Sequence, residues 1–410
     1  MLRIFDDYKG LPREMYVLFT ANVINRFGDF VSPLLALYLT QKLGMDATKT
    51  SFIVTLALLS RMPGSLLGGK LADHYGRRTT YLITQSIAGL LLLPCAFKIS
   101  DYAIITLLIA STFFNGAVRP ALDALAIDLL PADKRKLGIS LMYLGINLGV
   151  AIGPALAGLL FKVNLPLFFI VDVLTSIIAV GLVFAFIKES YIRNMIQNDT
   201  KTSETKPHLS TWHVLSQNRK LLSFILICSG FSFIYVQTKF SLPLLFGHAF
   251  GNNGSALLGT MFSVNAITVL ASTSFITYKT KKNATYMNVV MGGGFYAVGF
   301  GMYAFVSGYW MYIVATLIWT FGEILMATNI KAYIADRTPV EFRGRISALY
   351  LLLKAGMNSL GVLASGWLIP KVGYTQIWLY ILGASIILSA ALFIDNKSRK
   401  SLEQVKVVNE

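Results

Sequence analysis

Several charged side chains of this 410-residue chain lie inside long apolar runs, where a charge is costly unless it has a role. At the centre of a bilayer a charge costs roughly 2.5–3.5 kcal/mol on insertion scales, so charges kept there are usually functional. The carboxylates among them could bind a proton or a cationic substrate. The residues are Arg26, Asp29, Arg61, Arg119, Asp123, Asp172, Lys239, Glu323, Lys331 and Lys354.

Glu323 is the first candidate for this chemistry, because it follows Gly322 near the middle of an apolar run. Two interpretations are open. Its carboxylate could alternately hold a proton or a cationic substrate, or it could neutralise a basic side chain such as Lys354.

The first apolar run carries Asn22, Asn25, Arg26 and Asp29. Helical spacing places Asn22 over Arg26 and Asn25 over Asp29, which predicts one polar stripe near mid-membrane that lines a cavity. Whether Asp29 titrates or only neutralises Arg26 stays open.

Two further acids are expected to be structural. Arg119 and Asp123 are four residues apart, which favours an ion pair on one helix, most of all for Asp123. Asp172, nearer the outer end of its run, is expected to have a structural role.

Basic side chains at mid-depth bear on the substrate. Arg26, Arg61, Arg119 and Lys354 would make a shared cavity less acidic than simple cation efflux requires. This favours an anionic, zwitterionic or amphiphilic substrate.

A short charged stretch between two apolar runs predicts a hinge loop, which includes Gly69, Asp73, Gly76, Arg77 and Arg78. Backbone that leaves a helix must reach water or a protein partner, since lipid offers no hydrogen bonds. Gly76 permits a turn without a Cβ penalty.

The composition indicates what positions these residues. The chain is 55% hydrophobic and 14% charged, with mean hydropathy +0.62, whereas a soluble domain carries about 25% charged residues. Runs long enough to cross about 30 Å of hydrocarbon recur from end to end. We predict an all-α membrane protein with twelve transmembrane helices, at approximately 14–40, 50–71, 79–97, 102–130, 138–161, 166–188, 221–246, 255–277, 286–306, 310–335, 346–369 and 373–394.

Lys and Arg are concentrated in alternate connecting segments, which places both termini in the cytoplasm. This concentration accounts for most of the net charge of +16, so nucleic acid is not expected as a partner.

Cys95 and Cys228 both fall in apolar runs, so neither a disulfide framework nor a metal site is expected. No cleavable signal peptide is evident.

The chain divides into two similar halves. Asp128, Pro131 and Arg135 recur with the same spacing as Asp336, Pro339 and Arg343. The predicted domains are an N-terminal six-helix bundle at 1–188, a polar cytoplasmic linker at 189–220, and a C-terminal six-helix bundle with a short cytoplasmic tail at 221–410. Two pseudo-symmetric bundles with a substrate between them are typical of secondary transporters.

The hinge loop resembles the signature loop of the major facilitator superfamily, and the run Gly149, Gly153, Pro154 and Gly158 resembles the helix motif of its drug:proton antiporter branch with twelve spans. Ala157 stands where that motif often has glycine.

The second-half counterpart of the loop is degraded, with Lys281, Ala284 and Thr285 at the defining positions. Thr112 occupies the position where the family places an arginine in span four, and Arg119 lies further along that span.

The resemblance implies roles for some of these residues. Asp73 would be a gate residue by the start of span eleven, near 344–347, and Arg77 with Asp128 would complete a charge network closing the inner side. A glutamate in span ten is also a family feature, which favours Glu323 as the proton carrier.

From the residues alone, Arg135 and Arg343 are expected to bind loop carbonyls and lipid headgroups. The small residues of span five allow close helix packing, which could be against the other half. Pro154 would bend the helix.

We therefore expect a secondary active transporter that exports small amphiphilic or drug-like compounds in exchange for protons, by alternating access. Protonation of Glu323, or secondly of Asp29, would favour one orientation. The alternative is proton-coupled uptake or translocation of an anionic or zwitterionic solute or lipid.

An enzyme is not expected, because the histidines lie in predicted loops and none pairs with a cysteine. An ATP-driven pump is not expected either, because Leu71 replaces the Ser or Thr of a phosphate-binding loop. The protein should work as a monomer in the cell membrane, with a small molecule and protons as partners and no cofactor or metal.

Overall fold

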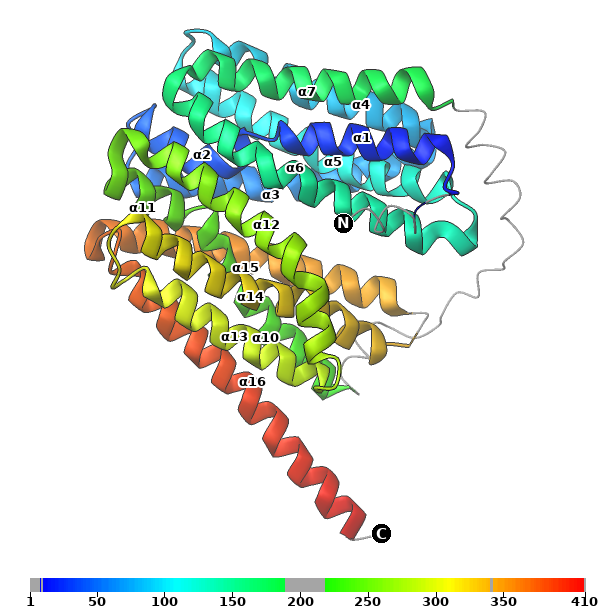
Figure 1. The fold of residues 1–410 in the computed structure, drawn as a ribbon, viewed down its shortest axis with the longest axis vertical. Coiled ribbons are helices and arrows are strands. Elements are labelled where there is room, and N and C mark those ends of the chain that lie inside the picture. The colour runs from blue at the N-terminus through cyan, green and yellow to red at the C-terminus, as the bar shows by residue number, and fades with distance from the viewer. Residues whose placement is uncertain (1–7, 9, 189–217, 340–341, 409–410) are drawn as a thin grey trace. The chain divides into compact units, whose positions relative to one another are not determined.

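The computed structural model describes residues 8, 10–188, 218–339 and 342–408, and every regular element within them is a helix (Figure 1). The predicted linker at 189–220 lies outside the described residues except for 218–220. The all-helical membrane class predicted from the sequence is confirmed.

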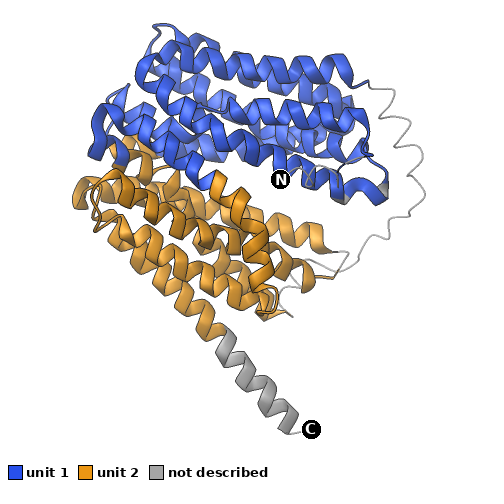
Figure 2. Cartoon of the chain, in the orientation of Figure 1, with its two compact units in different colours: residues 1–46, 52–204, 246–266 blue, residues 47–51, 205–245, 267–410 orange. Residues whose placement is uncertain are grey.

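The chain forms two compact units (Figure 2). Unit 1 comprises residues 1–46, 52–204 and 246–266, and unit 2 comprises 47–51, 205–245 and 267–410. This division differs from the sequence halves at two places. Residues 47–51 of the first half belong to unit 2, and residues 246–266 of the second half belong to unit 1. The predicted domain boundaries at 188 and 221 stay a prediction.

Most of unit 1 is built from the following helices: α1 (Arg13–Phe27), α2 (Val31–Gln41), α3 (Ala47–Tyr75), α4 (Arg77–Leu90), η2 (Leu93–Ala96), α5 (Asp101–Asp128), η3 (Ala132–Lys134), α6 (Arg135–Val163) and α7 (Leu165–Phe186). Local sequence explains two of their starts. The Ser100 and Asn164 side chains accept hydrogen bonds from the amides of Ala103 and Leu167 at the beginning of α5 and α7.

Most of unit 2 is built from α10 (Arg219–Tyr235), η4 (Val236–Thr238), α11 (Ser241–Phe250), η5 (Gly251–Asn253), α12 (Gly254–Thr280), α13 (Thr285–Met302), α14 (Tyr309–Asp336), α15 (Arg343–Val372) and α16 (Ile377–Val408). Residues 246–266, in α11, η5 and α12, belong to unit 1. Asn218 starts α10 by accepting a hydrogen bond from the amide of Leu221.

Within the described chain, nine helical stretches are long and apolar enough to cross a membrane. They are Ala47–Tyr75, Arg77–Ala96, Asp101–Asp128, Leu137–Val163, Leu165–Phe186, Arg219–Thr280, Tyr309–Asp336, Arg343–Val372 and Ile377–Asp395. The sequence predicts twelve spans, and three regions account for the difference. The first span is broken into α1 and α2, the stretch Arg219–Thr280 includes α10, α11 and α12, and α13 is rich in glycine. The count of twelve stays a prediction.

The first predicted span is not one helix. α1 ends at Phe27, and its cap residue Gly28 is followed by Asp29 and Phe30 before α2 begins. The sequence predicts one continuous span at 14–40. The break depends on tertiary contacts with α7, which are described below.

The hinge between α3 and α4 consists of Gly76, whose φ of 92° and ψ of 151° lie in a region that is essentially restricted to glycine. The turn expected at this residue is therefore present, and it is tighter than the predicted loop because helices continue to Tyr75 and resume at Arg77. His74 and His248, expected in loops, lie in the last turns of α3 and α11.

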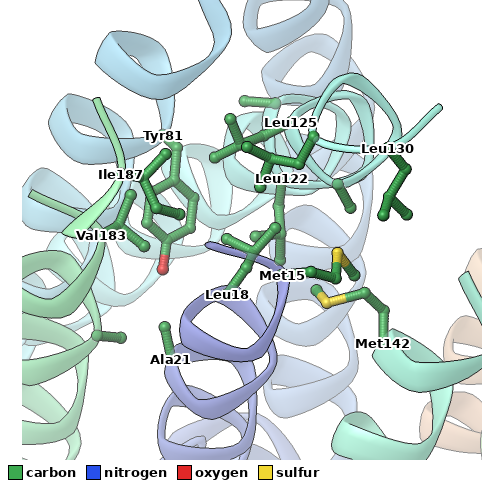
Figure 3. Close-up of a cluster of buried hydrophobic side chains, with 14 of the residues drawn as sticks. Met15, Leu18, Ala21, Tyr81, Leu122, Leu125, Leu130, Met142, Val183 and Ile187 are labelled. Carbon is green, nitrogen blue, oxygen red and sulfur yellow. The ribbon is translucent and has the colours of Figure 1, made fainter. Parts of the chain in front are cut away.

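Unit 1 contains a buried apolar cluster with side chains from α1, α3, α4, α5, α6 and α7 (Figure 3). Met15 and Met142 lie side by side at its edge, and Tyr81 lies beside Val183 and Ile187. Because these side chains come from distant parts of the sequence, they fix the helices on which the charged residues lie.

Candidate transport site

Five charged side chains of unit 1 form a polar cluster, defined here as Arg26, Asp29, Arg61, Arg119 and Asp123. Arg26 Nη1 lies 3.2 Å from Asp29 Oδ2, and Arg119 Nε lies 2.9 Å from Asp123 Oδ2. Arg26 also interacts electrostatically with Arg61, Arg119 and Asp123. The ion pair expected between Arg119 and Asp123 is present.

The break after α1 divides the polar stripe predicted on the first span. Arg26 lies in the last turn of α1 and Asp29 lies in the break, so they remain close. The two asparagines point to other helices. Asn22 Nδ2 donates to the Met142 carbonyl on α6 at 3.1 Å, and Asn25 Nδ2 donates to Ser176 Oγ on α7 at 3.4 Å. Both asparagines therefore join α1 to its neighbours.

Glycines allow α3, which carries Arg61, to pack closely against α5, which carries Arg119 and Asp123. A Cβ atom at Gly116 of α5 would overlap the backbone of Arg61 on α3, and one at Gly64 of α3 would overlap the backbone of Phe113. The backbones of α3 and α5 are therefore in contact at Arg61 and Gly116. Arg119 lies three residues after Gly116 on α5, so the two arginines are attached at neighbouring positions of the two helices. Within the described chain Arg61 has neither an ion pair nor a side-chain hydrogen bond.

The carboxylate of unit 2 lies against an aromatic wall. The Tyr235 hydroxyl of α10 donates a 2.6 Å hydrogen bond to Glu323 Oε1 of α14. Tyr235 stacks near Tyr296 and meets Trp319 edge-on, with ring centroids 6.2 Å apart in both pairs. Trp319 in turn stacks on Phe300 at 5.2 Å. Tyr235 and Glu323 are half-buried, whereas Tyr296, Trp319 and Phe300 are buried in unit 2, so the ring beside the carboxylate that stays partly accessible is that of Tyr235.

Lys354 of α15 interacts electrostatically with Glu323, which attracts it, and with Lys331, which repels it. The Glu323–Lys354 relation considered from the sequence is therefore present as an electrostatic interaction, while Glu323 accepts its hydrogen bond from Tyr235. Both interpretations of Glu323, proton carrier and charge partner, are compatible with this geometry.

The aromatic residues around Glu323 were not predicted from the sequence. Tyr235 and Tyr296 lie in long apolar runs, where a tyrosine is unremarkable. A buried tyrosine hydroxyl needs a hydrogen-bond partner, and that requirement was the available signal. Asn288 and Asn329, joined at 3.0 Å between α13 and α14, were missed for the same reason.

Residues 18–362 match the model of the Major Facilitator Superfamily. The chain belongs to this superfamily. An uncharacterized MFS-type transporter of Bacillus subtilis (strain 168), YttB, is 25% identical over 399 residues, which cover 96% of this chain and 98% of that protein. The family and this relative are transporters, so the chain is a membrane transporter and not an enzyme.

Other similar proteins are named for different substrates. A Na(+), Li(+), K(+)/H(+) antiporter of Planococcus maritimus is 19% identical over 392 residues, covering 89% of this chain and 91% of that protein. The 4-hydroxybenzoate transporter PcaK of Acinetobacter baylyi is 27% identical over 199 residues, covering 47% and 42%. The solved structure of the nucleoside transporter NupG has a TM-score of 0.78 at 13% identity, covering 93% of this chain and 100% of that one, and it shows the shared fold.

The superfamily signature loop is anchored within unit 1. Arg77 forms an ion pair with Asp128 of α5, and Arg78 donates to the Phe184 carbonyl of α7 at 2.8 Å. The pairing of Arg77 with Asp128 agrees with the sequence analysis. Asp73 is exposed on unit 1, and its expected position near 344–347 would join the two units. That position, and a role of the loop in gating, stay predictions.

The motif glycines of α6 pack against two helices. Cβ atoms at Gly149 and Gly153 would overlap the backbone of α1 at Phe27, and one at Gly158 would overlap the backbone of α12 at Ser255. Pro154 lies inside α6 opposite Gly259 of α12. Close helix packing by these glycines is therefore observed, chiefly against α1 for the first two.

The repeated arginine of unit 2 binds carbonyls, as expected. Arg343 Nε lies 3.1 Å from the Ala335 carbonyl and 3.3 Å from the Thr338 carbonyl. It thereby joins the start of α15 to the end of α14.

Proposed function

We propose that this chain is a secondary active transporter of the drug:proton antiporter branch, which exports small amphiphilic compounds in exchange for protons. The observation that carries the proposal is the Glu323 carboxylate, hydrogen-bonded to Tyr235 within an aromatic wall. A titratable acid supplies the proton site, and the half-buried Tyr235 ring beside it suits contact with apolar or aromatic compounds. The transporter works by alternating access, as a monomer in the cell membrane.

Glu323 couples the proton to the substrate in this proposal. When it is ionised, Glu323 accepts the Tyr235 hydrogen bond and attracts Lys354. Protonation removes that attraction and leaves Lys354 and Lys331 repelling each other. A change of charge at one carboxylate can therefore alter how α10, α14 and α15 interact, which is the kind of difference that biases two orientations. Asp29 is the second candidate for the proton.

The experiment is transport by purified protein in proteoliposomes under an imposed pH gradient, with ethidium as the probe. We expect Glu323→Gln to abolish the acceleration of ethidium transport by the gradient, because glutamine cannot take up the proton. Asp101→Asn is the matched control, since Asp101 is an exposed acid in the first turn of α5. Transport by Glu323→Gln with an unchanged response to the gradient would exclude Glu323 as the proton carrier.

A second candidate function is proton-coupled movement of an anionic solute. It is favoured by the unit 1 polar cluster, in which Arg26, Arg61 and Arg119 outnumber Asp29 and Asp123. The similarity to a 4-hydroxybenzoate transporter also favours it. The same vesicles would be tested with 4-hydroxybenzoate. If the anion moves in place of ethidium, and Arg61→Gln reduces its transport, the second function replaces the first.

A further inference from the structure

A buried carboxylate outside the two charged groups described above holds the break in the first span. Asp172 of α7 is 7% exposed, and its Oδ2 accepts hydrogen bonds from the backbone amides of Phe30 at 3.0 Å and Val31 at 3.3 Å. These amides are at the start of α2, where the first N–H groups of a helix have no partner within it. Asp172 therefore caps α2 from another helix.

Three further residues of α7, Phe168, Thr175 and Ser176, contact residues at or next to the same break. The Thr175 side chain occupies the space where a Cβ at Gly28 would lie, so only glycine fits there. Ser176 Oγ accepts hydrogen bonds from Asn25 at 3.4 Å and from Gln85 of α4 at 3.1 Å. Phe168, one turn before Asp172, packs on Phe30 with ring centroids 5.8 Å apart.

Unit 2 has a corresponding break that is held by a neutral group. η4 separates α10 from α11, and the fully buried Gln237 donates to the Gly361 carbonyl of α15 at 3.1 Å. Ser241 Oγ donates to Gln237 Oε1 at 2.6 Å. Gln237 is neutral and holds this second break as a donor. At the first break the backbone amides donate, so a neutral side chain can replace Asp172 only if it presents an acceptor oxygen, as asparagine does.

We propose that Asp172 is a positioning residue, which fixes the break between α1 and α2 and thereby sets the position of the Arg26–Asp29 pair. Asp29 lies between the Gly28 that contacts Thr175 and the Phe30 whose amide Asp172 binds. The pair can keep its place only while both neighbours are held. Loss of the acceptor would leave the Val31 amide without a partner and the Phe30 amide with the Gly28 carbonyl alone, at 2.8 Å, so the backbone at the start of α2 would move to find another partner.

The first test is amide hydrogen exchange, followed by mass spectrometry, on the purified full-length protein in lipid nanodiscs. It needs no substrate, so it is independent of the proposed function. We expect Asp172→Ala to speed exchange about tenfold at residue 31, because the Val31 amide loses its acceptor, and less at residue 30, because the Phe30 amide keeps the Gly28 carbonyl. Asp172→Asn keeps an acceptor oxygen and should exchange like the parent. Ser111→Ala, which removes a buried hydroxyl bonded to the Ala88 carbonyl, is the matched control.

If Asp172→Ala does not fold, Asp172→Glu is measured instead, since its carboxylate is displaced by one methylene and should also speed exchange at residue 31. Unchanged exchange there, in whichever of the two variants folds, would overturn the proposal.

The second test rests on the proposed function and uses ethidium transport at a series of pH values. A positioning role predicts that Asp172→Asn restores transport to within about twofold of the parent with the same pH midpoint, whereas Asp172→Ala stays at least about tenfold slower. If Asp172→Asn loses the pH dependence, Asp172 itself carries the proton and the positioning role is wrong. Failure of the parent to move ethidium would count against the proposed function alone, because the exchange result stands apart from it.

Discussion

At the scale of single residues, most intramembrane charges have partners within their own unit. Arg26 pairs with Asp29 and Arg119 with Asp123, over three and four positions of the chain. Asp172 is satisfied by backbone amides. Such arrangements reduce the cost of a charge in a low-dielectric setting. Arg61 is the member of the polar cluster that has neither an ion pair nor a side-chain hydrogen bond within the described residues.

The ion pair of Arg77 and Asp128 gives a stability prediction at this scale. Asp128 is 8% exposed and Arg77 is 29% exposed. Arg77→Gln should therefore destabilise the protein towards the lower end of the ~3–5 kcal/mol expected when one partner of a buried pair is removed. The measurement is thermal unfolding of the purified protein in detergent.

Two further variants make this prediction specific. Arg77→Gln combined with Asp128→Asn should be less destabilised than Arg77→Gln alone, because no uncompensated charge is left buried. Asp133→Asn, in the same connection but exposed, should change little. A double variant as unstable as the single one would mean that the charge of Asp128 is not the source of the loss.

At the scale of helices, adjacent glycines of α3 have opposite surroundings. A Cβ at Gly68 would overlap the backbone of Ala117 on α5, whereas a Cβ at Gly69 would meet nothing within 4 Å. We expect Gly68→Ala to destabilise by about 1–3 kcal/mol through overpacking. Gly69→Ala should be neutral or stabilising by up to ~1 kcal/mol, because alanine favours a helix. Thermal unfolding of the two variants measures this difference.

Transport by Gly69→Ala then tests the signature loop. If it folds normally but transports ethidium more slowly than the parent, Gly69 is needed during the transport cycle and not for folding. Equal destabilisation by Gly68→Ala and Gly69→Ala would contradict the difference in packing.

The sequence predicted most helices because apolar runs and charge positions are local signals. The spans containing Asp101–Asp128 and Arg135–Val163 were found within a few residues. The break at Gly28 was missed, because it depends on Thr175 and Asp172 of a helix far along the chain. The hydrogen bond of Tyr235 to Glu323 was missed for a similar reason, since it depends on how two helices are rotated about their axes.

The site was found in part by the same logic. Charges in apolar runs stand out in a sequence, so Glu323 and Arg26 were identified before their partners were known. Aromatic and amide partners do not stand out, because a membrane helix contains many such residues for packing alone. The pair of Arg77 and Asp128 was predicted because the resemblance to the superfamily implies that these two residues interact, which composition alone does not indicate.

At the scale of the whole molecule, the distribution of the Lys and Arg residues behind the net charge of +16 predicts the orientation of the chain in the membrane. Positive residues are retained on the cytoplasmic side during insertion. Lys279, Lys281 and Lys282 lie at one end of α12, whereas the other end begins after Gly251–Asn253, which has no basic residue. The end of α12 that carries the lysines should therefore face the cytoplasm.

Cysteine labelling on intact cells measures this orientation. We expect Asn252→Cys to react with a membrane-impermeant maleimide, and Lys282→Cys to react only after the membrane is permeabilised, since both positions are exposed on opposite ends of α12. The native Cys95 and Cys228 are buried and should give little background. The reverse pattern would invert the topology and place the termini outside. Labelling of both positions from outside would mean that α12 does not cross the membrane, and the assignment of Arg219–Thr280 to spanning helices would fail.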